Sequence, residues 1–138
     1  MRPSAIQAIR DRVSAAESSN DVLAAAWDAF DITQNILTHN VRPDPTAYAG
    51  VMFAIVAACE GRDELGFAPS MPTPTSSAED ATRPEQNVQI DEEDVADLAT
   101  CLDARLRATA VTFTSPADRQ ACLNAAESAR QIVELLGG

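Results

Sequence analysis

Residues 44–61 have the sequence DPTAYAGVMFAIVAACEG, which is the clearest helical pattern in the chain. Asp44 is a good N-cap residue, and Pro45 fits the first helical position, where its missing N–H costs nothing. The segment is apolar nearly all round, so we expect it to be the central, buried helix. One of its faces carries only small residues, which let a neighbouring helix approach closely. Gly61 is a typical C-cap residue, so we expect the helix to end at Glu60.

Four other segments show helical spacing of apolar residues, and none has a convincing strand pattern. Ser115 and Pro116, for example, repeat the cap-plus-proline start. We expect the five helices at about residues 4–18, 21–40, 45–60, 92–112 and 116–136. Short connections between most of them predict antiparallel neighbours. The predicted fold class is therefore all-α: a five-helix antiparallel up-and-down bundle, with residues 1–138 as a single helical domain.

The pattern breaks between the third and fourth helices. Residues 71–77, MPTPTSS, are rich in proline and hydroxyl side chains and show no periodicity. We therefore expect residues 62–90 to be a long flexible insert, either a loop or disordered. Leu65 and Phe67 are the residues expected to pin its start to the core.

Composition excludes several classes of function. The 138 residues include 21 acids, ten arginines and no lysine, for a net charge of −11. This charge argues against direct binding to nucleic acid or to an anionic membrane, and it favours basic protein partners. The most apolar run, residues 47–59, is shorter than the roughly 20 residues that span a bilayer. No apolar leader is present, and three cysteines without a CxxC pair suit free thiols, so we expect a cytoplasmic protein.

The negative charge is concentrated in residues 79–103, which hold nine acids and one arginine. Part of this is explained by carboxylates in the first turn of a helix, where the dipole favours them. The functional interpretation is a docking surface for a basic partner. Its candidate residues lie at the start of the fourth helix: Asp91, Glu92, Glu93, Asp94 and Asp97.

A pocket between the second and third helices is the alternative site. Its candidate ligand-binding residues are Trp27, Phe30, Asp31, His39, Tyr48 and Met52. The lone histidine shares a polar helix face with Asp31, an arrangement that could serve acid–base chemistry. A solvated face near a helix C-terminus, where the dipole favours a histidine, explains the same residues and is the preferred interpretation. No catalytic motif and no metal-ligand spacing is present, so we predict no catalytic residue, no metal site and no cofactor.

The third helix and Leu123 and Leu135 carry more apolar surface than five helices of this length can cover, which predicts a homodimer. The leading hypothesis is a non-enzymatic interaction or regulatory protein whose acidic segment meets a basic partner. The alternative is a small-molecule-binding bundle or a small enzyme that uses the pocket near Trp27 and Tyr48.

Overall fold

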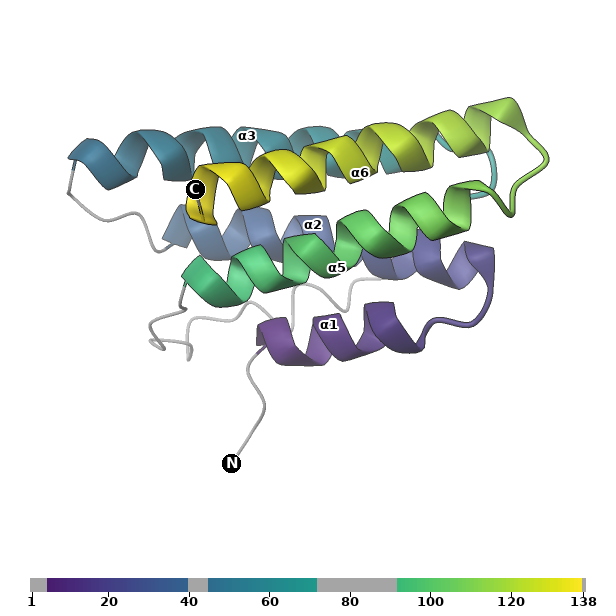
Figure 1. Ribbon diagram of the computed structural model, residues 1–138, viewed down its shortest axis with the longest axis horizontal. Helices are drawn as coiled ribbons and strands as arrows, with labels where there is room; N and C mark the ends of the chain where they lie inside the picture. The colour runs from purple at the N-terminus through teal and green to yellow at the C-terminus, as the bar shows by residue number, and fades with distance from the viewer. Residues whose placement is uncertain (1–4, 40–44, 72–91, 138) are drawn as a thin grey trace.

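Five α-helices make up most of the described chain (Figure 1). The structure is a computed structural model and describes residues 5–39, 45–71 and 92–137. The helices are α1 Ala5–Ala15, α2 Ser19–His39, α3 Pro45–Gly66, α5 Glu92–Ala110 and α6 Pro116–Gly137. No strand occurs in these three ranges. The expected fold class, an all-α five-helix bundle, is confirmed.

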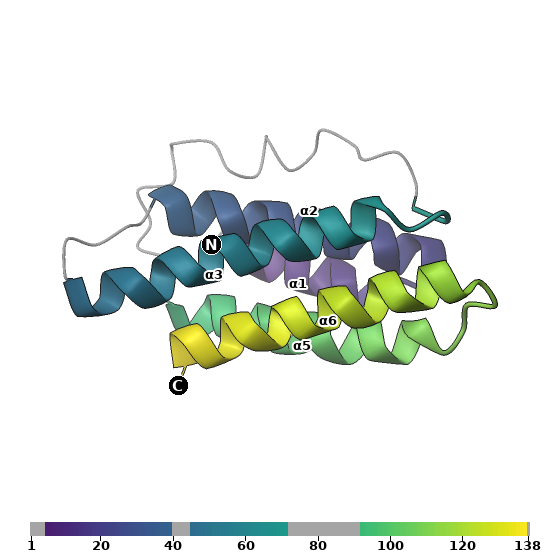
Figure 2. The same cartoon turned by 90° about the horizontal axis from the view of Figure 1, so that it is seen from above.

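Four of the helices form a ring in which α2 contacts α3, α3 contacts α6, α6 contacts α5, and α5 contacts α2. Each runs antiparallel to its two neighbours in the ring (Figures 1 and 2). The fifth helix, α1, packs on α2 and α5, on the side of the ring away from α3 and α6. Since α3 and α5 run in the same direction, the chain between them has to return from one end of the bundle to the other.

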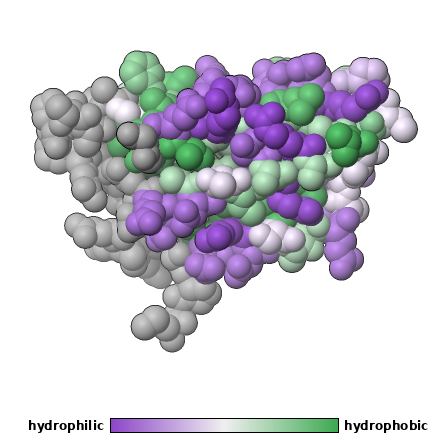
Figure 3. Space-filling view, viewed as in Figure 1, coloured by the Kyte–Doolittle hydropathy of each residue, from purple (hydrophilic) through white to green (hydrophobic). Residues whose placement is uncertain are grey.

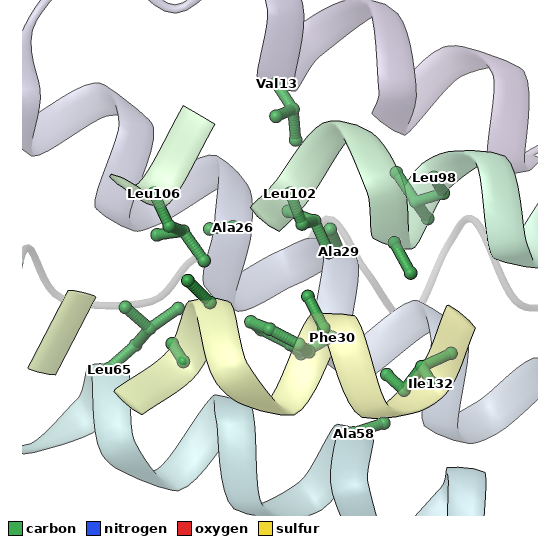
Figure 4. Packing of buried hydrophobic residues seen from close by; sticks show 14 of the residues in the cluster. Val13, Ala26, Ala29, Phe30, Ala58, Leu65, Leu98, Leu102, Leu106 and Ile132 are labelled. Carbon is green, nitrogen blue, oxygen red and sulfur yellow. The ribbon is translucent and has the colours of Figure 1, made fainter. Parts of the chain in front are cut away.

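The core lies inside the ring and under α1. Alanines bring the helices close together, and leucines, isoleucines and one phenylalanine fill the space between them. Figure 4 shows side chains from all five helices in this interior, among them Val13, Phe30, Leu65, Leu102 and Ile132. All five of these side chains are fully buried. On α1, the apolar stripe of Ile6, Ile9 and Val13 is buried against the neighbouring helices.

Two arginines help to hold α1 in place. Arg12 of α1 forms an ion pair with Asp28 of α2, whose side chain is almost completely buried. From α5, Arg105 donates a hydrogen bond from Nη2 to the carbonyl oxygen of Ala16, 2.6 Å away, just beyond the end of α1. Cations at a helix C-terminus satisfy its free carbonyls and match its dipole. The short first helix is therefore attached to both of the helices that it covers.

The expected end of α3 at Glu60 is wrong, because the helix continues to Gly66. Gly61 lies inside it and packs on the ring of Phe30: a Cβ built on Gly61 would lie 2.6 Å from Phe30 Cε1. This glycine allows α2 and α3 to approach each other and does not end the helix.

The prediction that α3 is the central helix is also wrong. Its small face is buried, with Ala54 and Ala58 fully covered, and a Cβ on Gly50 would lie 3.0 Å from the carbonyl oxygen of Leu135. Its opposite face, with Phe53 and Val56, is exposed. The small residues do permit close packing, as predicted, and Met52, Phe53 and Val56 lie on the exposed side of the helix.

The first part of the expected insert is ordered. Leu65 is fully buried, as predicted. Phe67 is 82% exposed, so the prediction that it fixes the chain to the core is wrong. The buried carboxylate of Asp118, in the first turn of α6, accepts hydrogen bonds from the backbone N–H of Ser70 at 2.9 Å and from its hydroxyl at 2.7 Å. Residues 62–71 are thus helix and a tethered turn. The remainder of the expected insert, 72–90, lies outside the described residues.

Candidate functional site

The acidic start of α5 is exposed where the structure describes it. Glu93, Asp94 and Asp97 are on the surface, within the first two turns of the helix. Asp94 and Asp97 make no ion pair with any described residue. Asp91 lies outside the described residues, and Glu92 begins the helix without a described side chain. Of the five candidate residues, the structure therefore brings three to one exposed helix end.

Other carboxylates on α5 and α6 are neutralised by arginines. Arg107 pairs with Asp103 at 2.5 Å (Nε to Oδ1) and with Glu127 at 3.5 Å (Nη2 to Oε2). Arg130 pairs with the same Glu127 and, at 2.9 Å, with Glu134. Hydrogen bonding to Arg130 lowers the pKa of Glu127 below its ordinary value. The face over α5 and α6 is mostly hydrophilic (Figure 3), but much of its charge is already balanced within the chain. Asp94 and Asp97 differ in this respect, because neither pairs with an arginine among the described residues.

The residues expected around a pocket between α2 and α3 do not all come together. Trp27 and Asp31 lie beside Arg62 of α3, whose Nη1 is 2.8 Å from Asp31 Oδ1 and whose Cζ is 6.0 Å from the centroid of the Trp27 ring. Arg62 was missed from sequence because it was assigned to the insert. The half-buried Arg62–Asp31 pair with a stacked tryptophan is a good way to join two helices.

Of the remaining four candidates, two have described side chains. Phe30 has no exposed surface and fills core space against Gly61, and Met52 lies on the exposed face of α3. His39 is the last residue of α2 and Tyr48 lies in the first turn of α3, but their side chains are outside the described residues. A ligand pocket at this place stays a prediction.

A groove on the described surface follows α3 and α6. Its apolar part is lined by Phe53, Val56 and Leu135 and has a volume of about 390 Å³. Glu60 lines this part and also the neighbouring polar part, where Glu127 faces it from α6. The volume is in the range of small-molecule sites, but such sites bury most of their ligand. An open groove between two helices, with exposed side chains on its edges, is better suited to a protein surface.

The described residues contain no group of three histidine, cysteine, aspartate or glutamate side chains that could hold a metal ion. No helix in the described ranges combines the length and the apolar character needed to cross a bilayer. The three cysteines are free, with Cys122 buried and Cys59 and Cys101 partly exposed. Comparison of the chain with protein-family models, curated proteins and solved structures finds no match.

Proposed function

We propose that this chain is a non-enzymatic interaction or regulatory protein that works in the cytoplasm as a homodimer and binds a basic protein partner at the start of α5. The observation that carries the proposal is the contrast between two groups of surface acids. Glu127 is shared by two arginines, whereas Asp94 and Asp97 are exposed and unpaired within the described chain. Three free thiols suit a reducing compartment.

The chemistry of such a partner follows from the charge. A net charge of −11 attracts cations over a distance set by the ionic strength, about 8–10 Å under physiological conditions. Within that distance, carboxylates such as Asp94 and Asp97, which pair with no described residue, can each accept an ion pair. The partner surface is therefore rich in lysine or arginine, and its binding weakens as salt is added.

The absence of lysine from this chain allows a sharp test. A peptide of alternating lysine and alanine serves as the basic probe, and a carbodiimide links its amines to carboxylates at zero length. Apart from the chain's own N-terminal amine, the peptide supplies every amine, so nearly all cross-links report contact with it. We expect the cross-links to concentrate on residues 93–97, and to fade as salt is raised.

A matched pair of variants shows whether the peptide binds at the start of α5 or is attracted only by the overall charge of the protein. Asp94→Asn with Asp97→Asn removes two charges from the proposed site, and Asp11→Asn with Glu17→Gln removes two exposed charges from the α1 end. With roughly 0.5 kcal/mol for each exposed ion pair, the first variant should bind the peptide about fivefold more weakly. If the second variant weakens binding equally, the protein is an unspecific polyanion and the proposed site is wrong.

A further inference from the structure

The two sides of the four-helix ring are covered differently. On one side, α1 packs on α2 and α5 and buries its own apolar stripe there. On the opposite side, α3 and α6 form the outer surface, and none of the described helices covers them (Figures 1 and 2). This uncovered side is the one that carries the groove between α3 and α6.

Large apolar side chains are exposed along this groove. On α3, Phe53 is 63% exposed and Val56 49%, and both line the groove. Met52, which precedes Val56 by one helical turn, is 39% exposed beside them. On α6, Leu135 is 37% exposed and lines the groove together with Phe53 and Val56. A helix face in water normally carries polar residues at such positions. These four residues, which we call the α3–α6 patch, are a face that another surface can cover.

The size of the α3–α6 patch indicates what kind of contact it can make. With about 150–200 Å² for a fully exposed large side chain, its four members expose on the order of 300 Å² of apolar surface. Stable interfaces bury about 800 Å² on each partner, a little over half of it apolar, whereas weak ones bury less than about 600 Å². The patch therefore matches the apolar part of a small, reversible interface.

We infer that the α3–α6 patch of one chain packs on the same patch of a second copy, so that α3 and α6 of both chains form the dimer contact. A two-fold axis places identical surfaces opposite each other. Both apolar patches are then removed from water, and no second, complementary surface is needed. This inference rests on the homodimer of the proposed function and gives it a location. The contact does not involve the exposed acidic start of either α5 helix, so the dimer presents two of them to a partner.

Charge gives this contact an unusual salt dependence. Glu60 and Glu134 line the apolar part of the groove, and each copy carries a net charge of −11. Bringing two such copies together is opposed by like charges, and salt screens that repulsion. The dimer should therefore become tighter as salt is added. Binding of a basic partner changes in the opposite direction, so the two interactions can be told apart in one titration.

Sedimentation equilibrium of the whole chain, over about 1 μM to 1 mM and at several salt concentrations, tests the inference. We expect a monomer–dimer equilibrium with a dissociation constant in the micromolar range, which falls at least threefold between about 50 mM and 500 mM salt. A protein that stays monomeric at 1 mM and 500 mM salt overturns the inference. A dimer that weakens with salt overturns it as well, since its contact would then be an ionic one.

Two charge-neutral double variants locate the contact. Phe53→Gln with Val56→Gln changes the α3–α6 patch, and Phe67→Gln with Val111→Gln changes the same residue types at exposed positions away from it, 82% and 81% exposed. We expect the first variant to weaken the dimer at least tenfold and the second to leave it unchanged, with the helical circular dichroism of both preserved. Equal dimerisation of the two variants places the contact elsewhere and refutes the inference.

The lysine–alanine peptide shows whether the dimer contact and the proposed partner site fail independently of each other. If the Phe53→Gln, Val56→Gln chain is monomeric and still cross-links the peptide at residues 93–97, both proposals stand. If it dimerises normally but cross-links at residues 93–97, only the dimer location fails. If the peptide protects the α3–α6 patch and no dimer forms, the groove belongs to a basic partner and the inference is overturned.

Discussion

Gly61 offers the most direct test of how α2 and α3 fit together. The substitution Gly61→Ala should destabilise the protein, although alanine is the better helix former by about 0.5–1 kcal/mol. The new methyl carbon would lie 2.6, 2.7 and 2.9 Å from three ring carbons of Phe30, whose side chain has no exposed surface. A buried ring has little room to move away, and overpacking a core by one carbon costs about 1–3 kcal/mol.

The cost of overpacking exceeds the gain in helix propensity, and the difference is a loss of about 1 kcal/mol in the free energy of unfolding. For a chain of this size, that lowers Tm by about 3–5 °C. Urea unfolding followed by circular dichroism measures the change, with the initial helical signal as a check on the fold. Gly66→Ala is the matched control, because the nearest atom to its new methyl would be Trp27 Nε1 at 3.9 Å. We expect that substitution to be neutral or to stabilise by up to about 1 kcal/mol.

A double-mutant cycle shows whether the ring is the cause. Phe30→Leu alone leaves a cavity and should cost about 1–3 kcal/mol, but it also makes room for a methyl group at position 61. The double variant should therefore be more stable than the sum of the two single losses predicts, by about 1 kcal/mol. If Gly61→Ala stabilises the protein as much as Gly66→Ala does, the close packing of α2 on α3 is wrong.

Three other predictions concern the start of α6, a buried thiol and the connection between α3 and α5. Asp118→Ala should cost about 1–3 kcal/mol and free the turn at Ser70, visible as faster amide hydrogen exchange there, because the N–H loses its acceptor. Burial raises the pKa of the Cys122 thiol to about 11, so this thiol should resist alkylation at pH 8 more than the two partly exposed cysteines. That pKa is raised above the value of about 9 in the unfolded chain. The stabilisation that the protonated thiol gives is therefore complete below pH 9 and is lost as the pH rises to about 11. Cys122→Ala should remove this loss of stability between about pH 9 and 11. Deletion of residues 74–81 should leave Tm within a few degrees, whereas deletion of residues 72–87 should abolish cooperative unfolding.

Helix starts could be predicted from sequence because their chemistry is local. Ser115 accepts the hydrogen bond from the backbone N–H of Asp118 at 3.4 Å, and Pro116 takes the first helical position, as expected. For α2 the cap is Ser18, whose hydroxyl accepts a hydrogen bond from Asp21 N at 3.1 Å, so the helix begins two residues before the predicted start. Such errors are small, since neighbouring serines compete for the same role.

The end of α3 could not be predicted in the same way. A glycine that ends a helix and a glycine that admits a neighbouring ring look identical in sequence, and Phe30 lies far from Gly61 along the chain. The error moved Arg62 into the insert, and the Arg62–Asp31 contact was missed with it. The candidate site was likewise predictable only where its features depend on local sequence. An acidic helix start was predictable, but which acids lack an arginine depends on how α5 packs on α6.

The direction of the helices explains why the chain between residues 71 and 92 is long. The end of α3 and the start of α5 lie at opposite ends of the bundle (Figure 1), and α5 alone, with 19 residues, is about 28 Å long. An extended chain covers at most about 3.3–3.6 Å per residue, so the return needs at least about eight residues. Deletion of residues 74–81 leaves a reach of roughly 45 Å, and deletion of 72–87 leaves less than about 20 Å, which cannot cover the distance. Topology thus requires about two fifths of the length of this connection.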